Sequence, residues 1–214
     1  MNRTLKAVVL CAGGALGIPL ASAGTQTYGF TNISGNNATN AAAGETQLRV
    51  TVSMLMGGKV GFHFFHMGNT PMTITQIYFD DNTPRLGAAD APAGSMGVAF
   101  APGGAPPDLP AGNNAMPVFL SNRRFTANSP APTHGVSPGE TLDLSFSIIG
   151  LFADVLDDIN SGELRIGIHV QAFGNGGSES FVNEPQDPVR PIPLPTAGAM
   201  GLAGLLLAGS RRRR

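Results

Sequence analysis

The chain has 214 residues, of which 42% are hydrophobic and 13% are charged, about half the charged share of an ordinary soluble domain. With 29 glycines, 17 prolines, no tryptophan and one cysteine, this composition argues against a helical bundle, a coiled coil or a charged disordered tail, and it favours a loop-rich, mostly β protein. All 14 acidic residues lie between positions 24 and 190, and this acidic centre argues against a nucleic-acid partner, since phosphates are bound by basic faces.

The N-terminus has the features of a secretory signal peptide, expected over residues 1–23. Arg3 and Lys6 form a basic start, followed by a weakly apolar run that three glycines and a proline interrupt. These interruptions disfavour a permanent anchor, because a membrane span needs about 20 apolar residues. Ala21 and Ala23 form an A-x-A pattern, which predicts cleavage by signal peptidase after the second alanine.

Cleavage there removes Cys11, so the mature chain has no thiol for a disulfide or for catalysis.

In the expected ectodomain, residues 24–190, apolar and polar residues alternate in many short segments, which is the period of a β-strand. The expected strands are 28–33, 48–56, 60–64, 75–79, 98–101, 116–120, 142–148 and 164–172. Each has one apolar and one polar face, so the expected fold is all-β: a single antiparallel β-sandwich, jelly-roll-like or immunoglobulin-like.

One short helix is expected at residues 151–160, where apolar residues recur on one helical face and Gly162 follows as a terminator. It would join two strands and cover an open end of the sandwich. The adjacent Asp157 and Asp158 point in different directions on such a helix. We therefore expect them to be solvated rather than to form the carboxylate pair of a glycoside hydrolase.

The histidines are the first candidates for a metal site. His63 and His66 have a spacing that suits a helix, but on the expected strand their side chains point to opposite faces and do not share an ion. His134 and His169 are isolated in the sequence. All four are expected to be surface or packing residues.

A second candidate metal site is a calcium site near Asp80, Asp81 and Asp90. The Asp-Asp-Asn run follows a strand, but it lacks the alternating acidic ligands and distant glutamate of an EF-hand loop. Such residues are ordinary after a strand, so turn formation is the favoured interpretation and no cofactor is expected.

The sequence carries no recognisable catalytic motif. The glycine-rich run 174–178 follows a strand, but no helical pattern begins after it. A hairpin loop is therefore favoured over a phosphate-binding loop, and no enzymatic activity is expected.

The C-terminal residues 191–214 contain three parts in order. A proline-rich stretch leads into an uncharged run of alanine, glycine, leucine and methionine over residues 197–209. As a helix this run would be about 20 Å long, short of the ~30 Å hydrocarbon core, while terminal arginines stay on the cytoplasmic side. The pattern indicates a transient membrane tether. Its defining residues are Pro193, Leu194, Pro195, Arg211, Arg212, Arg213 and Arg214.

This terminus resembles the PEP-CTERM class of bacterial sorting signals, and is closest to the variant that reads Val-Pro-Leu-Pro-Ala. Ile192 and Thr196 stand in place of the first and last residues of that motif. The resemblance implies processing by an exosortase, a membrane-embedded cysteine protease or transpeptidase, after transient insertion into the inner membrane. A GPI signal normally ends in an apolar tail, and a stop-transfer anchor usually has a longer apolar segment.

The resemblance implies an exported surface or extracellular-matrix protein of a Gram-negative bacterium, with a C-terminal membrane helix. The strand-like blocks 74–81, 164–171 and 177–181 are similar to ectodomains that precede such signals, and this similarity implies no activity. A non-enzymatic structural or adhesive role is expected. The alternative is a module that binds extracellular carbohydrate, with or without calcium, by analogy with other sandwiches. Its weakness is the scarcity of rings for stacking on sugars, only Tyr28 and Tyr78 besides phenylalanine.

Overall fold

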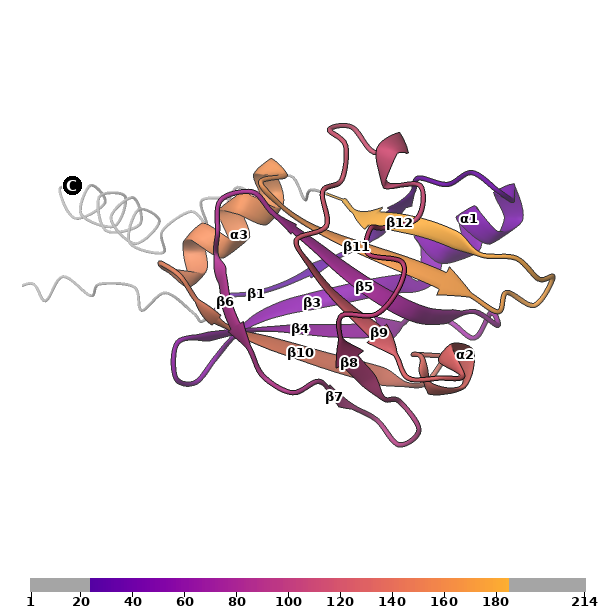
Figure 1. Ribbon diagram of the computed structural model, residues 1–214, viewed down its shortest axis with the longest axis horizontal. Helices are drawn as coiled ribbons and strands as arrows, with labels where there is room; N and C mark the ends of the chain where they lie inside the picture. The colour runs from indigo at the N-terminus through magenta and orange to yellow at the C-terminus, as the bar shows by residue number, and fades with distance from the viewer. Residues whose placement is uncertain (1–23, 185–214) are drawn as a thin grey trace, which may run out of the picture.

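The structure is a computed structural model that describes residues 24–184. The expected signal peptide with its cleavage site and the expected sorting signal lie outside these residues. Within them, two antiparallel sheets face each other around a shared apolar core (Figure 1). The prediction of a mostly β fold with two antiparallel sheets is confirmed. None of the helices in residues 24–184 is long and apolar enough to cross a membrane.

The first sheet has the order β1-β3-β4-β10-β6, and β7 also pairs with β10. These strands are β1 (Thr25–Tyr28), β3 (Leu48–Leu55), β4 (Lys59–His66), β6 (Leu86–Ala89), β7 (Ala93–Gly94) and β10 (Thr141–Ile148).

The second sheet has the order β2-β12-β11-β5-β9-β8. Its strands are β2 (Phe30–Asn32), β5 (Thr73–Asp81), β8 (Phe100–Pro102), β9 (Arg123–Ala127), β11 (Leu164–Gln171) and β12 (Glu179–Asn183). The predicted hairpin loop at 174–178 is confirmed, because β11 and β12 pair antiparallel on either side of it.

Four phenylalanine rings join the two sheets through the core. Phe62 and Phe146 come from the first sheet, and Phe79 and Phe125 from the second. Their rings meet edge to face, with centroids 5.0 Å apart for Phe62–Phe79 and 5.1 Å for Phe79–Phe146. Such pairs contribute about 0.5–1.5 kcal/mol each beyond the burial of their area. The alternating strands predicted at 60–64, 75–79 and 142–148 supply three of these rings on their inward faces.

The second sheet differs from the expected pattern of one buried and one solvated face. Every residue of β5 is buried, and so are seven of the eight residues of β11. The loop over residues 103–122 covers the outer face of this sheet. Beneath it lies a small apolar cluster made of Tyr78, Leu109, Ala115, Phe119 and Val182.

The strand predicted at 116–120 is wrong, because this segment belongs to that covering loop. Of its apolar residues only Phe119 is buried, by packing on the outer face of the sheet, whereas Met116, Val118 and Leu120 are exposed. The backbone is engaged locally: the Phe119 N–H donates to the carbonyl of Gly112 at 3.0 Å. The Leu120 N–H donates to a carboxylate oxygen of Asp80, also at 3.0 Å.

The prediction of a single helix is also wrong, since α1 (Ala38–Gln47) and the short α2 (Ala131–His134) are present as well. Asn37 caps α1, with its side-chain oxygen accepting from the N–H groups of Thr39 (2.9 Å) and Asn40 (3.1 Å). Gly44 lies against Phe181, whose ring would be 2.2 Å from an added Cβ atom. Since α1 contains no apolar residue larger than alanine, its sequence shows no apolar helical face from which a helix could be predicted.

The predicted helix is confirmed as α3 (Phe152–Ser161), which ends at Gly162 with a φ of 84°. It connects β10 of the first sheet to β11 of the second, at one end of the two sheets (Figure 1). Asp157 is exposed as expected, but the expectation for Asp158 is wrong. Its carboxylate accepts from Nε of Arg85 at 2.6 Å and from the Thr83 hydroxyl at 2.6 Å, so it fastens α3 to the turn between β5 and β6.

Candidate functional site

A buried ion pair fastens the covering loop to the second sheet. Arg165 of β11 and Asp80 of β5 lie side by side on the outer face, 7% and 1% exposed. Asp80 also accepts the N–H of Leu120, while Arg165 donates to the carbonyls of Pro117 and Val118. One cation and one anion thereby hold three backbone groups of the loop, and the loop in turn covers both charges.

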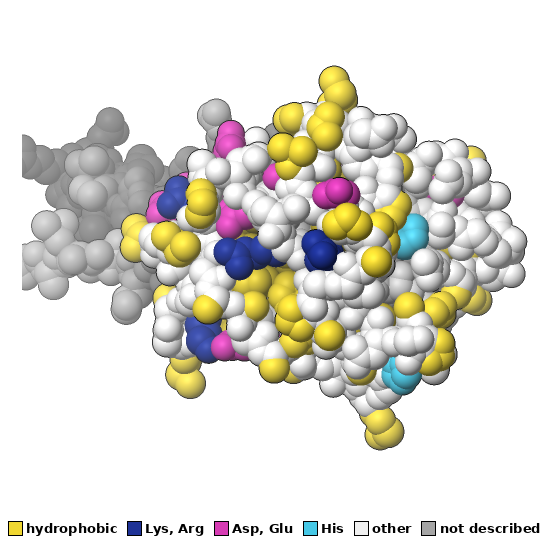
Figure 2. All heavy atoms as spheres, viewed as in Figure 1, with side chains coloured by type: hydrophobic (Ala, Val, Ile, Leu, Met, Phe, Trp, Pro, Cys, Tyr) yellow, Lys and Arg dark blue, Asp and Glu magenta, His cyan; other side chains and the backbone are white. Residues whose placement is uncertain are grey.

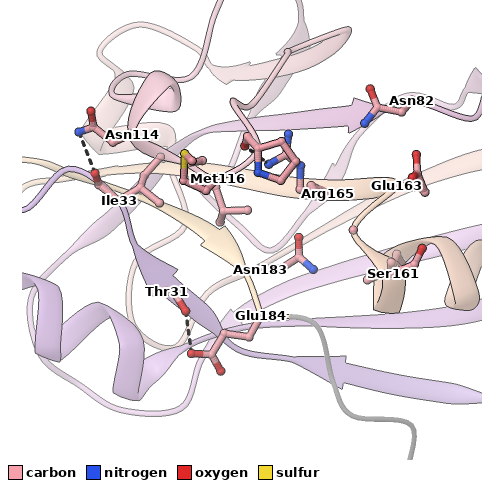
Figure 3. A pocket seen from close by; sticks show the side chains of 15 residues that line it. Thr31, Ile33, Asn82, Asn114, Met116, Ser161, Glu163, Arg165, Asn183 and Glu184 are labelled. Atoms are coloured by element: carbon pink, nitrogen blue, oxygen red, sulfur yellow. Dashed lines mark hydrogen bonds between the residues drawn. The ribbon is translucent and has the colours of Figure 1, made fainter.

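A cavity of about 480 Å³ opens at the edge of this loop, within the ~300–1,000 Å³ range of small-molecule pockets. It lies between the loop, the end of α3 and the strands β2 and β12 (Figure 3). The buried floor consists of Ala115, Ile159, Arg165, Val182 and Asn183. The more exposed lining consists of Thr31, Ile33, Asn82, Asn114, Met116, Pro117, Ser161, Gly162, Glu163 and Glu184.

The polar groups of this pocket are unevenly satisfied. On the floor, the Asn183 side-chain oxygen accepts the Ile166 N–H at 2.7 Å, but the side-chain nitrogen has no partner among residues 24–184. The Nε of Arg165 also lacks one there. On the rim, Glu163 and Glu184 supply two carboxylates, and Thr31 donates to Glu184 at 2.8 Å. The two unpaired nitrogens are enclosed by surrounding protein, whereas the rim carboxylates are exposed to solvent.

His63 and His66 make separate contacts. His63 Nδ1 is 2.7 Å from Asp143 on the exposed side of the first sheet. His66 is half-buried, and its Nε2–H donates to the carbonyl of Val136 at 2.9 Å. Burial lowers the pKa of His66, although the hydrogen bond to Val136 acts in the opposite direction.

The other two histidines lie apart from these and from the pocket. His134 Nδ1 faces the carbonyl of Asn128 at 3.3 Å. His169 is buried on β11, where its Nδ1 is 3.0 Å from the Ser180 hydroxyl oxygen, and burial lowers its pKa. They are surface and packing residues, as expected.

The three carboxylates suggested for calcium do not come together. Asp80 is bound by Arg165, and Asp81 accepts the backbone N–H groups of residues 85 and 86 in the following turn. Asp90 accepts from Nζ of Lys59 at 2.7 Å. Among residues 24–184, no three His, Cys, Asp or Glu side chains lie close enough together to hold a metal ion. The three carboxylates stay apart because each accepts hydrogen bonds from donors in a different segment of the fold.

Sequence reasoning missed one buried polar centre. The carboxylate of Glu179 is fully buried and accepts from the side chains of Asn32 and Ser34 and from the N–H groups of Asn36 (3.2 Å) and Asn37 (2.6 Å). These donors shape the turn that leads into α1. The only available signal was the density of asparagine and serine at 32–37.

Fold and site together define a two-sheet β domain with a polar pocket at the edge of a covering loop. No protein-family model matches the sequence, no curated protein is significantly similar to it, and no solved structure matches its fold.

Proposed function

We propose that this protein is an exported bacterial surface or extracellular-matrix protein with a non-enzymatic structural or adhesive role, processed by an exosortase at its C-terminus. The carrying observation is the ordered series of a proline-rich motif, a short apolar run and the arginine cluster Arg211–Arg214. Only six residues separate this series from Glu184, the last residue that the structure describes. Signal peptidase and the exosortase are the proposed processing partners, with transient tethering to the inner membrane.

The surface of the domain supports this role. Figure 2 shows a face made mostly of uncharged atoms, with basic and acidic side chains in small separate groups. No broad basic area suited to nucleic acid is visible on this face. The acidic excess of residues 24–190 favours solubility outside the cell.

Within the sandwich class, we propose the jelly-roll-like arrangement over the immunoglobulin-like one. The chain passes between the two sheets repeatedly, from β1 to β2, β2 to β3, β4 to β5, β5 to β6, β7 to β8, β9 to β10 and β10 to β11. Frequent crossing between sheets is typical of jelly rolls, in which two Greek keys are folded over each other.

An extracellular carbohydrate-binding module is the second candidate, and the pocket is the observation that favours it. Both tyrosines are fully buried, and none of the residues from 24 to 184 that line the pocket carries an aromatic ring. Sugar recognition there would depend on hydrogen bonds rather than on stacking. The calcium-dependent form of this candidate loses its proposed ligands, since the three aspartates are separately bound.

Mass spectrometry of the protein from wild-type cells and from cells lacking the exosortase tests the main proposal. The wild-type product should begin at Gly24 and lack residues 197–214, whereas the product without exosortase should keep the arginines and stay with the membrane. Pro193→Ala together with Pro195→Ala should block processing, and Pro188→Ala serves as the matched control. A wild-type product that still ends at Arg214 would refute the sorting signal and leave a plain anchor.

A further inference from the structure

One end of the first sheet exposes a group of large apolar side chains. Five of the ten such side chains that are exposed in residues 24–184 lie on two segments, the turn that joins β3 to β4 and the chain that follows β10. These segments adjoin, because the Ile148 N–H donates to the carbonyl of Gly58 at 3.0 Å. Single exposed apolar residues are ordinary on a protein surface, whereas a group of them marks a contact surface. This group, the apolar end, consists of Met54, Leu55, Met56, Ile149 and Leu151.

The core does not use the side chains of the turn. Val52 of β3 points inward and is fully buried, but Met54, the next residue on the same face, is 48% exposed. Met56 lies in the turn and is 97% exposed. Gly57 and Gly58 complete the turn with φ of 77° and 71°, and a Cβ atom added to either would meet nothing within 4 Å. The turn therefore projects beyond the core into open space, and packing of the fold does not explain its apolar residues.

The described chain begins and ends on this side of the molecule. Thr25 of β1 pairs with Ser53, directly beside Met54. Glu184 lines the pocket together with Ser161, the last residue of α3 (Figure 3). This helix starts next to the apolar end and lies across the same end of the two sheets (Figure 1). Both points at which the chain leaves the domain are thus at the end of the molecule that exposes the apolar group.

The position of Glu184 determines what this end faces in the tethered protein. Twelve residues, 185–196, separate it from the apolar run 197–209, and a chain of that length spans at most about 40 Å. While the run is in the membrane, the apolar end is therefore held close to the lipid surface.

We propose that the apolar end docks on the lipid bilayer while the chain is tethered, so that the domain stands on the membrane with the β3–β4 turn at the interface. Five exposed side chains form a small contact. The tether makes docking an intramolecular event, so that a weak contact is populated. Removal of residues 197–214 abolishes this advantage and allows the domain to leave the membrane. The inference rests on the proposed membrane tether.

The charges nearest the apolar end favour an apolar contact over an electrostatic one. Lys59, which follows the turn, is paired with Asp90 at 2.7 Å. Arg85, whose carbonyl accepts the Ile149 N–H at 2.8 Å, is paired with Asp158 at 2.6 Å. Peripheral proteins that bind anionic lipid use clusters of unpaired basic residues. Docking here should accordingly be as good on neutral phosphatidylcholine as on lipid that contains phosphatidylglycerol.

Two methionines allow the contact to be measured within one chain. Met56 and Met96 are both 97% exposed, but they lie at opposite ends of β10. Next to Met96, the Ser95 N–H donates to the carbonyl of Thr141, the first residue of that strand. At the rise of an antiparallel strand, Thr141 is roughly 24 Å from Ile148, which adjoins the turn.

The experiment oxidises methionine to its sulfoxide with hydrogen peroxide and follows each site by peptide mass spectrometry. On the full chain in phosphatidylcholine vesicles, Met56 should react about threefold more slowly than Met96, because only Met56 is shielded by lipid. In lipid-free buffer the two rates should be equal. Flotation of the vesicles shows separately whether the chain is tethered to them.

Ile149→Gln combined with Leu151→Gln should make Met56 as reactive as Met96 in vesicles. These side chains are 49% and 69% exposed, so their replacement leaves the core intact. The matched control is Met67→Gln, an apolar residue that is 67% exposed and follows β4 at the end remote from the turn. It should leave the protection of Met56 unchanged.

Equal oxidation of Met56 and Met96 in chains that float with vesicles refutes this inference alone. Protection of Met56 in lipid-free buffer also overturns it, because a second copy or a terminal segment of the chain then covers the apolar end. Protection that requires phosphatidylglycerol overturns it in favour of an electrostatic contact. A chain that does not float with vesicles refutes the tether and this inference together. A chain that floats with Met56 protected, but that no exosortase cuts, refutes the sorting proposal alone.

Discussion

Breaking the ion pair between Arg165 and Asp80 is expected to destabilise the domain and to release the covering loop. In Arg165→Met, the buried carboxylate of Asp80 keeps the N–H of Leu120 but loses its cation. Two loop carbonyls lose their donor at the same time. Removing one partner of a buried pair costs about 3–5 kcal/mol, because the other charge stays buried and uncompensated. We expect the free energy of unfolding to fall by about that amount.

A double substitution separates the value of the pair from the cost of stranding one charge. Asp80→Leu combined with Arg165→Met removes both charges, and replacing a buried pair by apolar residues is often close to neutral. The double variant should therefore lose less stability than the two single variants combined. Urea unfolding followed by far-UV circular dichroism measures all three, since the chain has no tryptophan for fluorescence.

The control is the ion pair between Lys59 and Asp90, whose side chains are 39% and 44% exposed. Exposed pairs contribute about 0–1 kcal/mol, so Lys59→Met should have a small effect. If Arg165→Met costs no more than Lys59→Met, the buried pair does not anchor the loop and the reasoning fails.

Three further substitutions test other parts of the fold. Gly44→Ala should lower the urea midpoint through a clash costing about 1–3 kcal/mol, because its new Cβ would lie 2.2 Å from the Phe181 ring; a stabilised variant would contradict the packing of α1. Burial lowers the pKa of His66 in the folded protein, so the unfolded chain binds more protons as pH falls below about 6.5 and stability declines. His66→Gln should reduce the decline measured between pH 7 and 5, and the reasoning fails if His134→Gln, at a half-buried position in α2, has the same effect. Glu179→Gln replaces one acceptor oxygen by an NH2 donor, although four donors surround the carboxylate. The free energy of unfolding should therefore fall by about 2–3 kcal/mol, and limited proteolysis at 32–37 should become faster. Unchanged stability and cleavage would show that the carboxylate does not organise this turn.

The strands could be predicted where one face of the strand is buried and the other is not, because apolar and polar residues then alternate along the sequence. The segments 48–56 and 142–148 show that pattern, and they became β3 and β10. The segment 116–120 has similar apolar residues, but only Phe119 is buried, by contact with the outside of the second sheet. Local sequence does not show that Met116, Val118 and Leu120 stay exposed, so their apolar character imitates a strand. The covering loop was therefore misread as a strand.

The pocket could not be predicted because its parts are distant in sequence. Asp80 and Arg165 are 85 residues apart, and only the pairing of β5 with β11 brings them together. Arg165 appeared as a charged residue on the polar face of its strand, and Asp80 appeared as one of the aspartates that follow a strand, with turn formation favoured over calcium binding. The adjacent Asp81 was also considered as a calcium ligand. Its carboxylate instead accepts backbone N–H groups and stabilises the following turn.

The low charge of the chain follows from the asymmetry between its two sheets. The first sheet keeps a partly solvated outer face, where Arg49, Thr51 and His63 alternate with core residues. The second is covered on both faces, so its outer positions are Gln76, Tyr78 and other groups bonded to the loop. A solvated face would have carried more charge, and 13% charged residues suffice because one of the two outer faces is not solvated. The covering loop ends before the edge of the sheet, and the pocket opens where this cover stops, between the loop, the end of α3 and the strands β2 and β12.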